Sequence, residues 1–384
     1  MFGKEFGSEK YSYRDEKTGL KVTQLTKGDC NSFIFYFTDN SFTTDDRDIY
    51  FMSDRLSSRP EIYNIFKMEL ETGRIIQISD EPGGINIEYQ TKTPDGETII
   101  YVAENQLKKL NTQTGECEVL YREKEGILIG SPFISPNKRY VGVARNEDVH
   151  LLPGANYCGF KETMYAIKKG WITIFDLHTG QVTDVYEDTQ WLGHFQFAPD
   201  DSGVAIFCHE GPWNLVQQRI WILDMMQRTV KPCFRQGEDD CVGHEFWTRD
   251  GLIFFDNRRR GHDGTITSSR TQATVVTAAG SQTPYIGLAD RYGKIVRKID
   301  MPYYCNHYHA NQDHSHLVGD EVDDLVLIDI RGEQPELHPL CTHSTSWRSQ
   351  QTHCHPTFNF AGDRVLFTSD RDGKCNVYLV DLKS

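Results

Sequence analysis

One phrase recurs seven times along the 384 residues: a turn rich in Asp and Gly, a short β-branched strand, and a second strand that ends near Asp-Leu or Thr-Gly. Short strands repeated every 40 to 63 residues are typical of a β-propeller, whose radial sheets leave few exposed edges. We therefore expect an all-β, seven-bladed propeller. The seven turns begin at Thr43, Thr93, Ser135, Ala198, Thr248, Asn311 and Phe360.

The two ends of the chain predict how the ring closes. The last repeat stops at Leu382 without an outer strand, while Leu20–Thr26 forms a β-branched strand before the first full repeat. We expect this N-terminal strand to complete the seventh blade. No linker or low-complexity tract interrupts residues 1–384, so a single domain is predicted, with a tandem of β-sandwiches as the alternative. The one helical signal, Lys161–Lys169, is long enough for one or two turns.

Composition excludes several classes of partner. The formal net charge is −14, which gives no general attraction for nucleic acid or an anionic membrane. No apolar run approaches a spanning helix, and the N-terminus lacks the apolar core of a secretory signal. The 10 cysteines include no Cys-x-x-Cys pair. We expect a cytoplasmic protein with reduced thiols, without an obligatory protein partner.

Six of the 14 histidines occupy a shared position within the repeats. In four consecutive repeats, histidines stand four to ten residues before the Asp or Gly of the turn, in the strand or loop expected to face the central axis of a propeller. His194 and His244 occupy this place singly. His307-x-His309 and His353-x-His355 occupy it in pairs.

A His-x-His pair in a strand would place both rings on one face, because strand side chains alternate. Imidazole nitrogens suit first-row divalent metals, and Gln350 adds a neutral oxygen close to His353 and His355. Because histidines stand at the same place in four consecutive repeats, this pattern favours a metal site. The alternative is that these histidines are hydrogen-bonded structural groups.

Other residues are candidates for acid–base work or carboxylate binding. His209 and Glu210 end a strand at Gly-Pro, and His244 is followed by Glu245, Phe246 and Trp247. An imidazole is the usual proton acceptor near neutral pH. Glu245 is expected to face away from His244, as its strand neighbour. Arg219 and Arg348 are candidate carboxylate clamps. Serine-hydrolase elbows, dinucleotide turns and His-Glu-x-x-His are absent.

The second half of the chain resembles the oligogalacturonate lyases, a family of pectin degradation. The resemblance lies in motifs that occur in the family's order with similar spacing from about residue 190 to 382. They are His209-Glu210-Gly211-Pro212, His244-Glu245-Phe246-Trp247, Cys305-Asn306-His307, Val318-Gly319-Asp320, Thr345-Ser346-Trp347 and Gln350-x-x-His353-x-His355-Pro356.

This resemblance implies a cytoplasmic, seven-bladed propeller enzyme that binds manganese and acts on a small acidic oligosaccharide such as digalacturonate or unsaturated digalacturonate. It implies that His244 is the base and Arg219 the catalytic arginine. The implied metal ligands are His307, His353, His355 and Gln350.

The implied chemistry is β-elimination from a 4-linked uronate, in which a base removes the C5 proton while positive groups neutralise the carboxylate. His209, Glu210 and Arg348 would bind the sugar. Departures from the family pattern are Asp29–Ser32, Trp213 and a short loop before Gln350. The alternatives are a lyase for another uronate disaccharide, a uronate isomerase or epimerase, a different divalent ion, and a non-catalytic TolB-like propeller scaffold.

Overall fold

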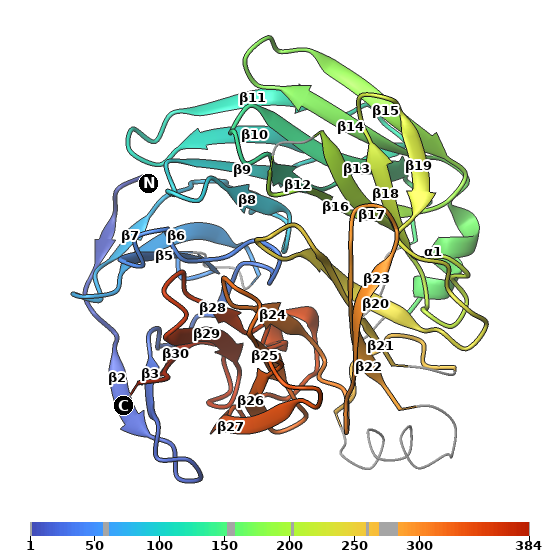
Figure 1. Cartoon of the computed structure of the whole chain (residues 1–384). Helices are drawn as coiled ribbons and strands as arrows, with labels where there is room; N and C mark the ends of the chain where they lie inside the picture. Colours follow the sequence, from blue (N-terminus) through green and yellow to red (C-terminus); the bar gives the residue numbers. More distant parts are fainter. Residues whose placement is uncertain are drawn as a thin grey trace. The chain divides into compact units, whose positions relative to one another are not determined.

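The strands of the described residues form seven sheets, which are the blades of a seven-bladed β-propeller (Figure 1). The structure, a computed structural model, describes residues 2–56, 61–151, 158–200, 203–258, 261–268 and 283–383. The fold predicted from the repeats is confirmed. Asp201, in the fourth predicted turn, lies outside the described residues.

The chain divides into two compact units. Unit 1 comprises Met1–Glu104, Lys108–Glu118 and Cys305–Ser384, and unit 2 comprises Asn105–Leu107 and Val119–Tyr304. Single-domain organisation stays a prediction.

Three sheets contain mainly residues of unit 1, and the strands of each sheet pair in the following orders. The first is β1 (Glu5–Phe6), β7 (Ile75–Gln77), β6 (Asn64–Glu69), β5 (Asp48–Ser53) and β4 (Ser32–Ile34). The sixth is β24 (Tyr308–Ala310), β25 (His316–Asp320), β26 (Asp324–Asp329) and β27 (Glu336–Thr342). The seventh is β2 (Tyr11–Arg14), β3 (Lys21–Gln24), β30 (Asn376–Asp381), β29 (Arg364–Ser369) and β28 (Thr357–Phe358).

Three further sheets belong to unit 2. The third sheet in chain order contains β12 (Ile127–Ile134), β13 (Tyr140–Glu147), β14 (Gly170–Asp176) and β15 (Val182–Asp188). The fourth contains β16 (Leu192–Phe197), β17 (Val204–His209), β18 (Ile220–Asp224) and β19 (Thr229–Pro232). The fifth contains β20 (Val242–Trp247), β21 (Ile253–Asn257), β22 (Tyr285–Ala289) and β23 (Ile295–Asp300). The remaining sheet, second in chain order, contains β8 (Gln90–Lys92), β9 (Thr98–Ala103), β10 (Gln106–Asn111) and β11 (Cys117–Arg122).

The recurring turn has a local hydrogen-bond explanation. The Thr93 hydroxyl accepts a 3.0 Å bond from the backbone N–H of Thr98, the first residue of β9. Ser135 makes the same bond to Tyr140, at the start of β13. A hydroxyl that satisfies the first N–H of the strand fixes where the strand begins. This explains the Thr or Ser at the start of these turns.

The strand after each turn is largely buried, and its side chains pack against a neighbouring sheet. In unit 1, Tyr50 of β5 and Ile99 of β9 belong to one apolar cluster. In unit 2, Ala144 of β13 and Phe207 of β17 belong to another. The core therefore lies between the faces of successive sheets.

The N-terminal strand joins the C-terminal sheet, as expected. β3 pairs antiparallel with β30, with Val22 opposite Val380, and β2 adds a further strand outside it (Figure 1).

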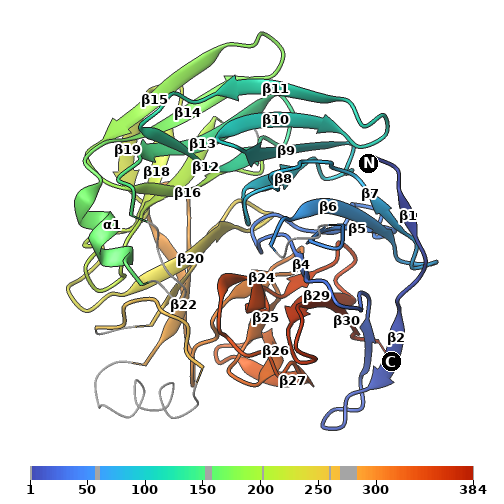
Figure 2. The same cartoon turned by 180° about the vertical axis from the view of Figure 1, so that it is seen from behind.

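The predicted short helix is α1 (Phe160–Ala166), which precedes β14 in unit 2 (Figure 2). Its Phe160 ring packs edge-on against Trp191, with 5.0 Å between the centroids. Among the described residues, no helix is long and apolar enough to cross a bilayer.

Candidate active site

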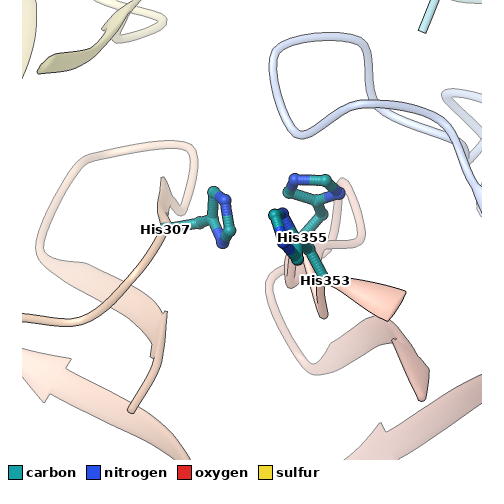
Figure 3. A group of neighbouring side chains, drawn as sticks. All are labelled: His307, His353 and His355. Carbon is teal, nitrogen blue, oxygen red and sulfur yellow. The ribbon is translucent and has the colours of Figure 1, made fainter. Parts of the chain in front are cut away.

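Three buried histidines of unit 1 converge on one point. His307 directly precedes β24, and His353 and His355 lie between the 3-10 turn η2 (Gln350–Thr352) and β28 (Figure 3). One nitrogen of each ring lies within 4.8 Å of one nitrogen of each of the other two. The exposed fractions are 1%, 2% and 5%, respectively. This spacing allows a single ion to contact all three rings.

The reason predicted for this convergence was wrong, although the convergence itself is present. His353 and His355 do not belong to a strand, since β28 begins at Thr357. Instead, His355 has a left-handed backbone with φ of 44°. The path of the chain before β28, and not strand alternation, brings the two rings together.

His309 does not join the group. Its Nδ1 accepts a hydrogen bond of 3.2 Å from the backbone N–H of Phe358. Burial lowers the pKa of His309 to about 4, which keeps the ring neutral. His307 and His309 were expected on one face of a strand, but His307 precedes β24 and the group of converging rings does not include His309.

An aspartate orients His307. Oδ2 of Asp320 lies 2.7 Å from His307 Nδ1, and the backbone N–H of His307 also donates to the Asp320 carboxylate. A carboxylate accepts but cannot donate, so it selects the tautomer that carries a proton on Nδ1. The lone pair of the neutral ring is then on Nε2, which is the usual arrangement of a metal-ligating histidine.

His353 gives the clearest indication that the three rings could bind another group. Among the described residues neither of its ring nitrogens has a hydrogen-bond partner, although the side chain is buried. Burial, and then the neighbouring His307, place the pKa of His353 well below its usual range. Buried polar groups are normally satisfied, so two orphaned nitrogens indicate a site for another group. Neutral imidazoles fit a divalent first-row ion.

Gln350, the fourth predicted ligand, is in η2. Its amide nitrogen donates a 2.7 Å hydrogen bond to Glu88 Oε1. Burial raises the pKa of Glu88 to about 7, although the bond from Gln350 acts in the opposite direction. With the amide nitrogen held by Glu88, the amide oxygen is the atom of Gln350 suited to a metal.

The predicted base, His244, is in unit 2 at a bulge of β20. Gly243 pairs with Asp256, the pairing resumes at Phe246, and His244 has a φ of 50°. A bulge re-aims side chains and breaks the alternation of the strand. β16 repeats this geometry: its register shifts after Gly193, and His194 has a φ of 48°.

His244 is buried and contacts a carboxylate and an aromatic ring. Its Nδ1 lies 3.1 Å from Asp256 Oδ1. Trp213 packs edge-on against it, with ring centroids 4.9 Å apart. The imidazole is therefore held on two sides.

Arg219 directly precedes β18 in unit 2 and is 3% exposed. Its Nε donates to Glu245 Oε2 at 3.2 Å, and its Nη2 donates to Glu210 Oε1 at 3.0 Å. Nη1 is buried and has no hydrogen-bond partner among the described residues. Burial would lower the pKa of Arg219, but its neighbours, including these carboxylates, hold it well above the usual value. One donor of a fixed guanidinium thus remains for a ligand.

Glu210 and His209 lie at the end of β17, as expected from the Gly-Pro sequence. Glu210 accepts from Arg219 and from the Cys208 thiol, the latter at 2.8 Å. Burial would raise the pKa of Glu210, but Arg219 keeps it below the usual range. His209 Nε2 lies 3.2 Å from Asp188, and burial lowers the pKa of His209. Arg348, in contrast, is exposed in the segment before η2.

Several residues of the two clusters were not predicted. Glu245 was expected to face away from His244, but no partner was predicted for it; its fully buried side chain, which lies in the bulge, accepts a hydrogen bond from Arg219. Asp256 belonged to no motif, and the motif Val318-Gly319-Asp320 did not mark Asp320 as the partner of a histidine. The repeated Gly-His dipeptides Gly193-His194 and Gly243-His244 were the sequence signal that could have revealed the bulge.

Comparison with known proteins gives consistent matches over the whole chain. A family model described as oligogalacturonate lyase matches residues 1–384. An oligogalacturonate lyase of Dickeya dadantii (strain 3937) is 25% identical over 401 residues, covering 98% of this chain and 97% of its own. An oligogalacturonide lyase of Pectobacterium atrosepticum is 25% identical over 393 residues, covering 96% and 95%.

Two solved structures are also similar. An oligogalacturonate lyase in complex with manganese has a TM-score of 0.87 and 26% identity, covering 100% of this chain and 98% of its own. An oligogalacturonate lyase from Vibrio parahaemolyticus has a TM-score of 0.85 and 26% identity, covering 99% and 98%.

Proposed function

The chain belongs to the oligogalacturonate lyase family, a family of carbon–oxygen lyases, and from this premise we propose that it cleaves short oligogalacturonates by β-elimination. Digalacturonate and unsaturated digalacturonate are the proposed substrates. His244 is the proposed base and Arg219 the proposed carboxylate clamp. The observation that carries the proposal is the group of three converging, buried imidazoles, in which His353 has two orphaned nitrogens.

The ligands proposed for the metal are His307, His353, His355 and Gln350. The residues fit such an ion because the rings are close together and the pKa of His353 is low, so that its ring is neutral and one of its nitrogens offers a lone pair. Manganese is proposed because a similar structure is a manganese complex, and another divalent ion is the alternative. When bound, the ion would act as a Lewis acid on the uronate carboxylate.

The proposed proton acceptor is Nε2 of His244. In the uronate whose C4 carries the glycosidic oxygen, the C5–H bond is adjacent to the carboxylate, which makes this proton the removable one. The electron pair of the C5–H bond forms a C4–C5 double bond, the C4–O bond breaks, and the departing oxygen takes up a proton. A neutral imidazole suits the first step near pH 7.

Arg219 is proposed to bind the carboxylate whose negative charge grows as the proton leaves. Support comes from its unpaired Nη1 and from the two carboxylates that hold its other donors. A charged donor already in place needs no rearrangement during the reaction, and this lowers the barrier. A bound divalent ion together with Arg219 would provide the local positive charge by which a chain of net charge −14 binds an acidic sugar.

His209, Glu210 and Arg348 are proposed to bind the sugar. Glu210 would act mainly through Arg219, which it contacts directly. His209, at the end of β17, would donate to a hydroxyl. Arg348 is exposed and would meet the carboxylate of a neighbouring sugar.

The proposal is tested with purified protein, digalacturonate and unsaturated digalacturonate, with manganese or with chelator. Products are identified by mass spectrometry, because the change in ultraviolet absorbance depends on whether the substrate already has a double bond. Metal-dependent cleavage that is lost in His244→Ala but retained in His178→Ala, an exposed histidine, supports the proposal. Isomerised sugar without cleavage would replace the lyase by an isomerase or epimerase. The absence of turnover on any uronate disaccharide would refute both enzymes.

A further inference from the structure

We propose that Asp256 is a positioning residue that holds His244 in the tautomer whose lone pair is on Nε2. The inference rests on the proposed function in so far as His244 is the base. It concerns a buried carboxylate to which neither the motifs nor the comparisons give a role.

The geometry connects Asp256 to the imidazole and not to solvent. Asp256 lies in β21 opposite Gly243, next to the bulge that carries His244. Its side chain is 1% exposed, and Oδ1 lies 3.1 Å from His244 Nδ1. An ionised carboxylate is only an acceptor, so the neutral ring must carry its proton on Nδ1. The lone pair needed for proton abstraction is then on Nε2.

A buried arginine keeps Asp256 charged. Arg258 is fully buried, and its Nε donates to Asp256 Oδ2 at 3.3 Å. The guanidinium lies between two aromatic rings, 4.8 Å from the centroid of Trp213 and 4.5 Å from that of Tyr304. Its Nη1 also donates to the Thr265 carbonyl at 3.0 Å. The cation is thus held in one place.

The groups that face Asp256 act on its ionisation in opposite directions. Burial raises its pKa to about 6, while the Arg258 guanidinium acts to lower it; burial also lowers the pKa of the nearby His262 to about 3, so that ring is neutral. His244 faces it from β20. The carboxylate is therefore mostly ionised at pH 7, the state in which it selects the tautomer.

The neighbouring sheet shows that the bulge does not require an aspartate. In β16 and β17 the residue opposite Gly193 is Cys208, yet His194 has the same left-handed conformation as His244. The backbone geometry thus forms with either residue in that place. Asp256 is therefore not required for the bulge. Its role is to provide a hydrogen-bond acceptor for Nδ1 of His244.

The first test is Asp256→Asn, with Asp250→Asn as the matched control in the exposed turn of the same hairpin. Arg258 Nε would hold the asparagine oxygen, so the amide nitrogen would donate to His244 Nδ1 and force the proton onto Nε2. We expect nitrogen-15 NMR of labelled histidine, assigned with His244→Gln, to show the Nδ1–H tautomer in the wild type and the control. Asp256→Asn is expected to show Nε2–H. With digalacturonate, kcat should fall about 10²- to 10⁴-fold, with a much smaller change in KM.

A second variant covers the case in which an unpaired Arg258 prevents folding. Asp256→Asn/Arg258→Met removes both charges together and is expected to keep kcat at least about tenfold below the wild type. An Nε2–H tautomer in the wild type, or unchanged tautomer and kcat in both variants, would overturn the proposal. The NMR result does not depend on turnover. A protein inactive on every uronate but with the expected tautomers would therefore refute the proposed function and leave this inference standing.

Discussion

Oδ2 of Asp320 lies 2.7 Å from Nδ1 of His307, and the same relationship recurs between Asp256 and His244 at 3.1 Å. In both cases the histidine lies at or before the first strand of a sheet, and the aspartate lies near the end of the second. A carboxylate on Nδ1 leaves Nε2 as the nitrogen with the lone pair. This arrangement occurs in unit 1 for a proposed metal ligand and in unit 2 for a proposed base.

His353→Ala should abolish stoichiometric metal binding, because it removes one of three converging imidazoles. Metal content after dialysis against manganese, measured by mass spectrometry, checks this, with the exposed His338→Ala as control. Manganese at about 100 times its Kd should stabilise the wild type by about 2.7 kcal/mol and leave the variant unaffected. Equal metal content in the two variants would count against the site.

Arg219→Lys should lower kcat/KM by at least about tenfold, because an ammonium cannot contact Glu210, Glu245 and a substrate carboxylate in the fixed geometry of a guanidinium. Steady-state kinetics checks this, with the exposed Arg235→Lys as control. Arg219→Ala should also lower the free energy of unfolding by about 3–5 kcal/mol, since two buried carboxylates would lose their cation. Wild-type kinetics in the lysine variant would exclude the clamp.

Gly243→Ala should disturb the cluster of unit 2 without changing a polar group. A Cβ at this position would lie 1.9 Å from the Trp213 ring, which packs against His244. We expect overpacking to cost about 1–3 kcal/mol of stability and to lower kcat as the imidazole shifts. Denaturant unfolding and kinetics test this against Gly7→Ala, whose Cβ would meet nothing within 4 Å. Identical behaviour of the two variants would contradict the packing argument.

Asp39→Asn should stabilise the protein more at pH 8 than at pH 4. Burial raises the pKa of Asp39 to about 6, despite opposing interactions that include the Lys92 ammonium. The folded state therefore binds the proton more tightly than the unfolded state, and wild-type stability falls as the pH rises from about 4 to about 6. The gain at pH 8 should be at most about 3 kcal/mol.

Asp45→Asn is a control for the pH-dependent stabilisation expected of Asp39→Asn. The pKa of Asp45 is lowered, chiefly by the Thr43 hydroxyl, so Asp45→Asn should lose stability at neutral pH relative to acid. Urea unfolding at several pH values measures both differences. A gain for Asp39→Asn that does not vary with pH would mean that ionisation of Asp39 carries no cost.

The fold could be predicted because the residues that specify each turn are close to one another in the sequence. The Thr93 hydroxyl accepts a hydrogen bond from the N–H of Thr98, only five residues away. One short segment of sequence therefore specifies both this turn and the start of the strand that follows it. Repetition of that stretch at a propeller's period predicted the seven blades. The missing outer strand after Leu382 predicted the pairing of β3 with β30.

The histidines of the site were predicted from their position within the repeats and from the family motifs. The arrangement and contacts of their side chains were not. Only the folded chain decides that His353 and His355 converge outside any strand, and that Glu245 accepts a hydrogen bond from Arg219. The Asp256–His244 contact likewise requires a strand register and a bulge together. A turn is specified by neighbours in sequence, whereas these contacts depend on where separate strands place their side chains. For that reason the sequence by itself determined the seven blades and the candidate site residues. Only the tertiary structure decided which other side chains contact those residues.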